Sequence, residues 1–191
     1  CTYLTLFMPL FYTICLLYTK IMDKKTDLRI RAKALRKGLD ISAISSNIVK
    51  EIRKQQYYIN AKNVLLFYPM KYEIDLRDLL NDDKNFYLPK VNQDKLYVCP
   101  FKKGDKLEQS DFKVEEPCSN HVSPKILDLV FVPALAADYE NYRLGYGGGY
   151  YDRFLAEYNN FVSVTPIAKE LCVEKLPRES FDIKTDYILS V

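Results

Sequence analysis

Four of the six glycines in the chain lie within five residues, between Gly145 and Gly149. Because glycine has no Cβ, the backbone N–H groups of such a stretch can approach a bound group closely, and the start of a following helix adds partial positive charge. Arg143 can donate a fork of hydrogen bonds to phosphate oxygens. The carboxylate of Asp152 suits either a magnesium ligand or a helix cap. This arrangement predicts a phosphate-binding loop.

The glycine stretch differs from the common nucleotide-binding patterns. It lacks the Gly-Lys-Ser/Thr of a Walker loop and the GxGxxG spacing of dinucleotide-binding loops. Two alternatives stay open for it: a turn with a capping aspartate, and an RNA-binding Gly/Tyr/Arg segment, although such segments are longer and repetitive. The single histidine, His121, excludes an HExxH zinc site, argues against a Ser-His-Asp triad, and is expected in a solvated loop. Chemistry here must use carboxylates, Lys, Arg, Tyr, backbone amides or a metal ion.

The composition is that of one globular domain. Hydrophobic residues make up 48% and charged residues 28% of the 191 residues, which argues against disorder. The formal net charge is only +3 and the basic residues are spread along the chain, so we expect no nucleic-acid partner. Five scattered cysteines without a CxxC pair do not form a disulfide framework and suit a reducing compartment, so we expect a cytoplasmic protein.

The first 19 residues differ from the rest of the chain because they carry no charge. A stretch of this length can span a bilayer, so a membrane anchor or a targeting segment, mitochondrial or other, is one reading. Four threonines, Pro9 and the start of a soluble pattern at Met22 favour the other reading, in which the apolar segment 1–21 lies outside the working domain. We therefore expect residues 22–191 to form a single domain, with membrane contact only if residues 1–19 are a genuine anchor.

The elements that must position the glycine loop alternate between strands and helices. Helical spacing covers residues 24–39, where Leu28, Ala32, Leu35 and Leu39 predict an apolar face, and residues 42–54, 75–80 and 150–158. Short apolar runs predict strands at 63–68, 86–88, 96–98, 128–132, 161–167 and 187–191, and residues 102–116 are polar and loop-like. Such alternation favours an α/β fold, a three-layer α/β/α sandwich with a mostly parallel central sheet, Rossmann-like.

The string RLGYGGGYYD, residues 143–152, closely resembles the signature of the 5-formyltetrahydrofolate cyclo-ligases, also called methenyltetrahydrofolate synthetases. Further segments agree with that family in order and spacing, from Asp23 to the C-terminus. They are Lys25 to Arg29, Tyr68-Pro69, Glu73-Ile74-Asp75, Leu88-Pro89-Lys90, Phe112 to Pro117, Asp128 to Pro133, Leu176-Pro177 and Asp182 to Asp186.

The resemblance implies a reaction. ATP would phosphorylate the formyl oxygen of 5-formyltetrahydrofolate, the other folate nitrogen would attack the activated carbon, and phosphate would leave. The products would be 5,10-methenyltetrahydrofolate, ADP and phosphate, with Mg²⁺ as the cofactor that accompanies ATP. Because both nucleophiles belong to the substrate, the enzyme needs to position two ligands and stabilise phosphate charge.

The resemblance also assigns roles to the matching residues. Catalytic residues would be Arg143 and Glu73. ATP would be bound by Lys25, Arg29, Arg143, Gly145, Gly147, Gly148, Gly149, Tyr150, Tyr151 and Asp152, the folate by Glu73, Phe112 and Tyr151, and Mg²⁺ by Asp152 and Asp182. Taken alone, Lys25 and Arg29 would be interpreted as a solvated helix face, Glu73 as a surface carboxylate and Phe112 as a core residue.

Three residues depart from the family pattern. Ala137 stands where many members have Phe, Leu171 near a common Gln, and Phe181 where His is frequent. We expect them to line the pocket and to affect substrate affinity more than reaction class. Two other functions stay open: a non-catalytic folate- or phosphate-ligand-binding protein of the same fold, and a membrane-tethered interaction protein. We expect a monomer that binds ATP and 5-formyltetrahydrofolate.

Overall fold

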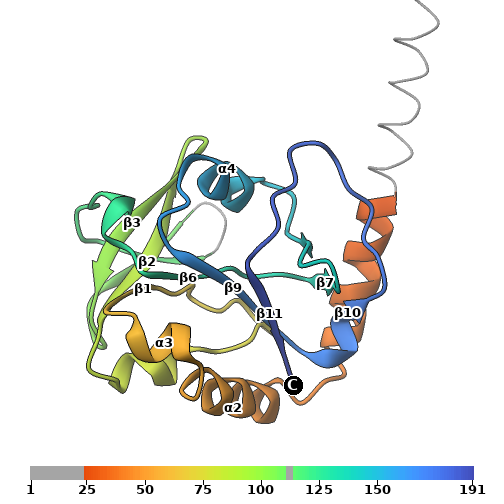
Figure 1. The fold of residues 1–191 in the computed structure, drawn as a ribbon, viewed down its shortest axis with the longest axis horizontal. Helices are drawn as coiled ribbons and strands as arrows, with labels where there is room; N and C mark the ends of the chain where they lie inside the picture. The colour runs from red at the N-terminus through yellow and green to blue at the C-terminus, as the bar shows by residue number, and fades with distance from the viewer. Residues whose placement is uncertain (1–23, 111–113) are drawn as a thin grey trace, which may run out of the picture.

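The computed structural model of the protein describes residues 24–110 and 114–191 (Figure 1). The N-terminal segment 1–21 and the predicted folate-binding residue Phe112 lie outside these residues. No helix in the described part of the chain is long and apolar enough to cross a membrane.

A six-stranded sheet forms the middle layer, in the order β11-β9-β6-β1-β2-β3. Neighbours pair in parallel from β11 to β2, and only β3 runs antiparallel, which confirms the mostly parallel sheet. The strands are β1 (Asn63–Leu65), β2 (Asn85–Asn92), β3 (Lys95–Phe101), β6 (Leu129–Phe131), β9 (Val162–Ile167) and β11 (Tyr187–Ser190).

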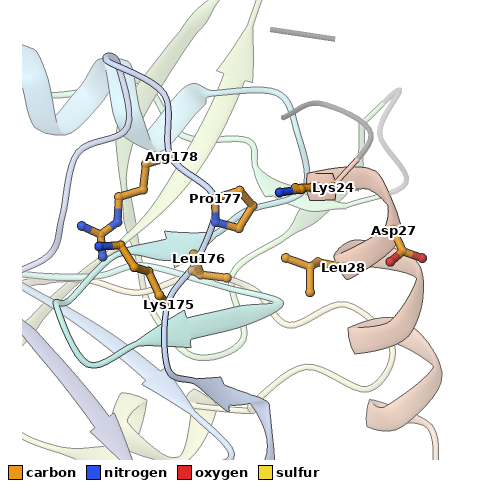
Figure 2. A pocket seen from close by; sticks show the side chains of 7 residues that line it. All are labelled: Lys24, Asp27, Leu28, Lys175, Leu176, Pro177 and Arg178. Atoms are coloured by element: carbon orange, nitrogen blue, oxygen red, sulfur yellow. The ribbon is translucent and has the colours of Figure 1, made fainter. Parts of the chain in front are cut away.

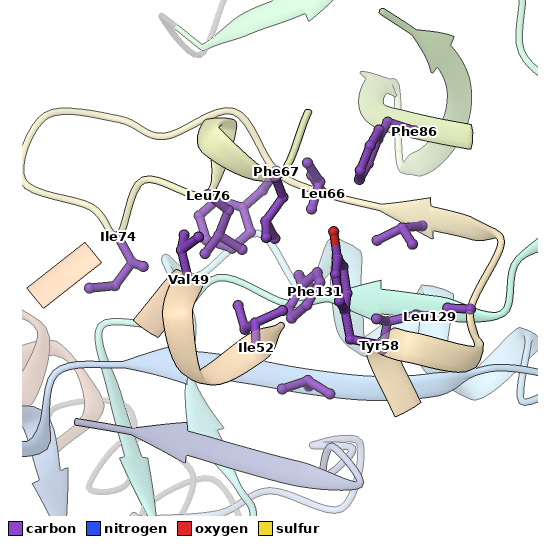
Figure 3. Close-up of a cluster of buried hydrophobic side chains, with 14 of the residues drawn as sticks. Val49, Ile52, Tyr58, Leu66, Phe67, Ile74, Leu76, Phe86, Leu129 and Phe131 are labelled. Atoms are coloured by element: carbon purple, nitrogen blue, oxygen red, sulfur yellow. The ribbon is translucent and has the colours of Figure 1, made fainter. Parts of the chain in front are cut away.

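Helices cover both faces of this sheet. The helices α2 (Ile41–Ile52) and α3 (Gln56–Asn60) lie on one face and α4 (Tyr150–Glu157) on the other, which confirms the three-layer sandwich (Figure 1). Alternate residues of β6 serve the two layers: Phe131 packs in the cluster with α2 (Figure 3), and Val130 packs in the cluster with α4. This two-sided burial explains why the strands are continuous apolar runs.

A second, three-stranded sheet in the order β10-β7-β8 carries the chain toward the glycine loop. Its strands are β7 (Ala136–Asp138), β8 (Arg143–Leu144) and β10 (Cys172–Val173). The strands predicted from the sequence leave a loop between Val132 and Gly145, and this part of the prediction is wrong, because β7 and β8 lie there. The polar stretch 102–116 also contains strand structure, because β4 (Leu107–Gln109) pairs with β5 (Glu115–Pro117). Strands of two or three residues are too short to show a hydrophobic period.

Short 3₁₀ helices complete the chain. They are η1 (Arg77–Asn81), close to the short helix predicted at 75–80, η2 (Pro124–Ile126) and η3 (Lys169–Leu171).

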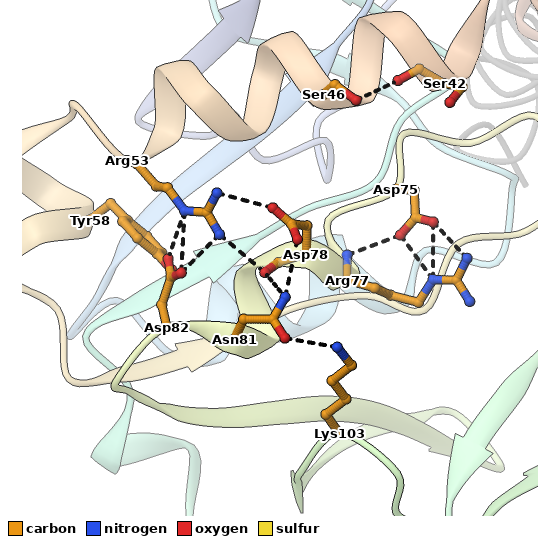
Figure 4. A network of polar contacts seen from close by, with 10 residues as sticks. All are labelled: Ser42, Ser46, Arg53, Tyr58, Asp75, Arg77, Asp78, Asn81, Asp82 and Lys103. Carbon is orange, nitrogen blue, oxygen red and sulfur yellow. Dashed lines mark hydrogen bonds and ion pairs between the residues drawn. The ribbon is translucent and has the colours of Figure 1, made fainter.

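The segment between β1 and β2 is fixed to α2 by polar contacts (Figure 4). Arg53, which follows α2, binds Asp78 at 3.0 Å and Asp82 at 2.8 Å. The backbone N–H of Asp75 donates to Ser45 Oγ of α2 at 2.9 Å. Exposed ion pairs of this kind add little stability singly, but several of them on one segment restrict its conformation. They hold the connection that starts at the carboxyl end of β1, the edge where open α/β sheets bind ligands.

Candidate active site

The helix over residues 24–36 turns three of its six cations toward the domain. Lys25 and Arg36 are 5% and 4% exposed, and Arg29 is half-buried. Steps of four and seven residues keep these three side chains on one helical face. The prediction that Leu35 belongs to the buried face is wrong, since Leu35 is 47% exposed. Burying cations costs free energy unless partners compensate them, so this face marks a site rather than an ordinary core contact.

Two predicted site residues at opposite ends of the chain meet in the structure. The Nζ of Lys25 binds both carboxylate oxygens of Asp182, at 2.9 and 2.7 Å, and Glu179 at 2.5 Å. The backbone N–H of Glu179 donates to Asp182 at 2.7 Å, which closes a tight turn around the lysine. The sequence analysis missed Glu179, because one carboxylate in a polar stretch carries no signal by itself.

Arg29 connects the same helix face to the glycine loop. Its Nε donates to the carbonyl of Gly145 at 3.0 Å. Gly147 has a φ of +110°, and a Cβ built on it would lie 3.6 Å from the guanidinium carbon of Arg29. The loop therefore needs glycine at this position for the left-handed backbone. A Cβ alone would make ordinary contact with Arg29, whereas a branched side chain would crowd the guanidinium.

We expect Gly147→Val to weaken nucleotide binding about tenfold or more, because the branched side chain would strain the backbone and push Arg29 from the loop, at the cost of a charged hydrogen bond. Nucleotide titration measures this effect. Gly104→Val is a matched control, because Gly104 has a φ of +95° but nothing within 4 Å of its Cβ position. If both variants bind ADP as the parent protein does, the loop does not contact nucleotide.

Glu73 is joined to the glycine loop through Tyr146. The Tyr146 hydroxyl donates to Glu73 Oε1, and the backbone N–H of Met70 donates to Glu73 Oε2 at 2.7 Å. Burial, with the nearby Glu73 carboxylate, raises the pKa of Tyr146 above its ordinary value, so the hydroxyl stays protonated as the donor. At 6% exposure, Glu73 is not the surface carboxylate that it would be outside a site.

Arg36 is a site residue that sequence reasoning missed. Its guanidinium donates to Tyr146 Oη at 2.9 Å and to the Tyr72 carbonyl at 2.7 Å, and it lies 3.8 Å from Glu73 Oε1. A basic residue on a helix usually belongs to a solvated face. The sequence feature that could have identified Arg36 is its position, three helical turns after Lys25 on the same helical face.

Arg143 holds the base of the loop. Its side chain is 3% exposed, and it donates to the Ile183 carbonyl at 2.5 Å and to Asp152 Oδ1 at 3.0 Å. Burial lowers the pKa of Arg143 from its ordinary value, and the Asp152 carboxylate opposes that shift, so the guanidinium stays charged. These contacts join β8, α4 and the C-terminal segment. Direct contact between Arg143 and a phosphate stays a prediction.

The glycine loop runs directly into α4. Gly149 is the N-cap residue, with a φ of +65°, and no side chain caps the helix, which leaves its first N–H groups for an anion. Asp152, in the first turn, accepts from Ile183 N at 3.1 Å as well as from Arg143.

The tyrosines of this first turn point to different surroundings. A Cβ on Gly148 would come within 2.5 Å of the Tyr150 ring, and the Tyr150 hydroxyl lies 3.4 Å from the Gln93 carbonyl. The Tyr151 hydroxyl is buried without a hydrogen-bond partner in the described part of the chain, and burial raises its pKa. A buried hydroxyl that lacks a partner suits the predicted contact of Tyr151 with a ligand.

A cavity of about 530 Å³ opens between the helix 24–36 and the C-terminal segment (Figure 2). Leu28, Leu176 and Pro177 give it an apolar wall, and charged groups surround that wall. The remaining lining residues are Lys24, Asp27, Lys175 and Arg178. It lies one helical turn from Lys25, at the edge of the predicted phosphate site.

A second cavity, of about 750 Å³, lies on the other side of Glu73. Its walls come from α2 and from the segment after β1, including Ser45, Pro69 and Met70. Glu73 therefore stands between this cavity and the glycine loop, because its carboxylate binds Tyr146. This position suits a residue that contacts one substrate while the loop holds the other.

The predicted magnesium ligands Asp152 and Asp182 do not share a ready-made cage. Among residues 24–110 and 114–191, no group of three or more His, Cys, Asp and Glu side chains is placed to hold a metal ion. Mg²⁺ is, however, commonly held by one or two carboxylates together with water and substrate phosphates. Beside Asp182, Glu179 Oε1 is buried with no hydrogen-bond partner in the described residues. The oxygen donors therefore fit an ion that nucleotide phosphates complete.

The three departures from the family pattern fall in two places. Ala137 and Leu171 are 0% and 5% exposed and pack together in one core cluster, so the expectation that they line the pocket is wrong for both. Phe181 is 55% exposed, and its ring lies 5.7 Å from Lys25 Nζ, at the phosphate end of the site. His121, outside the site, is exposed as predicted.

The chain is similar to known proteins of one family. The sequence profile of the 5-formyltetrahydrofolate cyclo-ligase family matches residues 21–191. A 5-formyltetrahydrofolate cyclo-ligase of Haemophilus influenzae is 31% identical over 174 residues, which cover 83% of this chain and 91% of that protein.

Two solved structures also resemble the fold. The 5,10-methenyltetrahydrofolate synthetase of Aquifex aeolicus has a TM-score of 0.75 at 29% identity, with 87% of this chain and 89% of that chain covered. A synthetase of the same name from Mycoplasma pneumoniae has a TM-score of 0.71 at 21% identity, covers 87% of this chain and 98% of its own, and supports the fold alone. From the profile match and the relative in Haemophilus, the chain belongs to the 5-formyltetrahydrofolate cyclo-ligase family.

Proposed function

We propose that the protein catalyses the ATP-dependent cyclisation of 5-formyltetrahydrofolate to 5,10-methenyltetrahydrofolate, with release of ADP and phosphate. The observation that carries the proposal is the convergence of one cationic helix face on both functional segments. Arg29 binds the glycine loop, and Arg36 lies against Glu73 and Tyr146. Phosphate-binding and folate-binding groups are thus held side by side by one rigid element.

The chemistry explains why the site needs few reactive side chains. A formamide is a poor electrophile, and its oxygen is a poor leaving group. Attack of the formyl oxygen on the γ-phosphorus breaks the bond to ADP. The phosphorylated oxygen makes the formyl carbon a better electrophile and is itself a better leaving group. The second folate nitrogen then bonds to the formyl carbon and gives up its proton, the carbon–oxygen bond breaks, and the oxygen leaves with phosphate. The protein has only to align the ligands and stabilise the charge on the transferring phosphoryl group.

In this proposal each segment of the site has a distinct task. Arg29, Lys25 and the N–H groups at the start of α4 bind the nucleotide phosphates, and Arg143 holds the loop in position. Glu73, fixed by Tyr146 and Met70, orients the folate near its formyl group. Mg²⁺, held by Asp152 and Asp182, would neutralise phosphate charge when bound.

The two cavities suit the two substrates. The apolar wall of Leu28, Leu176 and Pro177 can cover a flat base, and Leu28 lies on the same helix as the phosphate ligands. We therefore place the adenine of ATP there. The larger cavity beside Glu73 then takes the folate, whose formyl group must meet the γ-phosphate.

One assay tests the proposal. The protein is mixed with Mg-ATP and 5-formyltetrahydrofolate, and methenyl absorbance is followed with time. We expect absorbance to rise and one ADP to form for each methenyl group. Binding of both ligands without turnover would instead support the alternative, a non-catalytic folate- or phosphate-ligand-binding protein.

The boundary of the working domain gives a separate prediction. A chain that begins at Met22 should fold and keep full activity, because every described contact of the site comes from residues 25–183. Circular dichroism and the methenyl assay, compared with the full chain, measure this. Loss of folding or turnover would show that residues 1–21 belong to the domain.

We also propose that the protein acts as a monomer in the cytoplasm. The scattered cysteines, without a CxxC pair, suit a reducing compartment. Sedimentation of the purified protein tests the monomer. Fractionation of the native protein tests the compartment and the alternative of a membrane-tethered interaction protein.

A further inference from the structure

Lys25 is fully occupied as the structure stands. An ammonium group has three N–H donors, and three carboxylate oxygens accept from Lys25 Nζ: one from Glu179 at 2.5 Å and two from Asp182 at 2.7 and 2.9 Å. The side chains of Lys25 and Glu179 are each 6% exposed, and that of Asp182 is 16% exposed. Lys25 therefore cannot bind a phosphate until at least one carboxylate lets it go.

The two carboxylates also carry more charge than Lys25 can neutralise. The next cation along the chain, Arg178, is turned away and binds Asp138 and Glu140 instead. Glu179 Oε1 is buried and has no hydrogen-bond partner in the described part of the chain. A buried carboxylate oxygen without a partner is costly, so it marks a place where a further positive group is expected.

We propose that Glu179 is a metal ligand that exchanges cations: with Asp182 it holds Lys25 in the absence of nucleotide and Mg²⁺ in its presence. The inference rests on the proposed ATP-dependent reaction. Mg²⁺ prefers carboxylate and phosphate oxygens and is usually bound by one or two carboxylates plus substrate phosphates. When Mg-nucleotide arrives, the ion takes the carboxylates and the ammonium of Lys25 is freed for phosphate. Every charge then keeps an opposite partner.

The test measures ADP affinity by calorimetry with and without Mg²⁺, and Mn²⁺ binding to the ADP complex by electron paramagnetic resonance. Glu179→Gln removes the charge at constant size, and the turn survives because the Glu179 backbone N–H, not its side chain, binds Asp182. Glu174→Gln is the matched control, an exposed glutamate of the same segment. Thermal melts check folding, and Glu179→Asp is a second variant that keeps the charge.

We expect the ratio of ADP affinities with and without Mg²⁺ to fall about tenfold or more in Glu179→Gln, as loss of a metal-site partner does. In the absence of Mg²⁺, ADP should bind Glu179→Gln more tightly than it binds the parent protein, because only one carboxylate then holds Lys25. Glu179→Asp and Glu174→Gln should keep most of the ratio. An unchanged ratio in Glu179→Gln overturns the inference and leaves the proposed function intact. If the parent protein binds no ADP under either condition, both fall.

Discussion

Replacing Arg143 by alanine should lower kcat by about a hundredfold or more, which corresponds to loss of roughly 3 kcal/mol of transition-state stabilisation, the usual cost of one such donor. The side chain is 3% exposed and spans two partners, Ile183 and Asp152. Lysine cannot span both partners with a planar fork, so Arg143→Lys should fail nearly as badly. Steady-state rates in the methenyl assay measure both variants.

Nucleotide titrations, with thermal melts to check folding, distinguish two ways in which Arg143 could act. The variant leaves the Ile183 carbonyl and one Asp152 oxygen without their donor, at about 1–3 kcal/mol for each unsatisfied group. A domain of this size then loses about 2–4 °C of Tm for each kcal/mol. If kcat falls while nucleotide affinity holds, Arg143 acts on the phosphoryl group. If affinity falls with kcat, it acts by holding the loop. Arg31→Ala, at a 74% exposed arginine, is the control. A normal rate in Arg143→Ala would refute both.

Glu73→Gln should reduce turnover sharply while ADP affinity stays close to that of the parent protein. Both Glu73 oxygens are acceptors, one from Tyr146 and one from Met70 N–H, and Arg36 lies 3.8 Å away. Glutamine supplies only one acceptor and removes the charge opposite Arg36. The side chain that orients the folate would therefore turn or disorder, and alignment of the reacting atoms would be lost.

The measurement pairs the methenyl assay with ADP titration. Glu51→Gln is the control, because the Glu51 carboxylate lies on the surface of α2, 40% exposed, where it pairs with Lys54 at 2.7 Å. A wild-type rate in Glu73→Gln would show that Glu73 does not orient the folate and has only a structural role.

The sequence predicted the large sheet and its layers because their signals are local. The run at 128–132 is apolar on every residue but the first, as a strand buried on both faces must be, and β6 (Leu129–Phe131) lies within it. The order of the strands depends on contacts between distant segments, which no local period records. The short sheet of β7, β8 and β10 was not predicted, because a strand as short as β7, with the sequence Ala-Ala-Asp, shows no alternation of apolar and polar residues.

The sequence identified most residues of the site but not which of them contact one another. The family signature identified Lys25, Glu73, Arg143 and Asp182, but their partners follow from the folded chain. Arg36 and Glu179 escaped because their residue types are common on surfaces. Apolar spacing predicted that Leu35 is buried, whereas Leu35 is exposed and the basic residues Lys25 and Arg36 are buried instead. The spacing of apolar residues thus fails to predict the buried face of a helix that packs against a ligand site.

Lys25 and its partners stand 154 and 157 residues apart in the chain. On the ribosome, the helix 24–36 therefore emerges long before Glu179 and Asp182 have been made. Lys25 therefore stays without these partners until residues 179 and 182 have been added, and closing so long a loop is an entropic cost that is offset only once the rest of the domain has folded. A nascent chain that has not yet reached Asp182 should consequently be inactive in the methenyl assay.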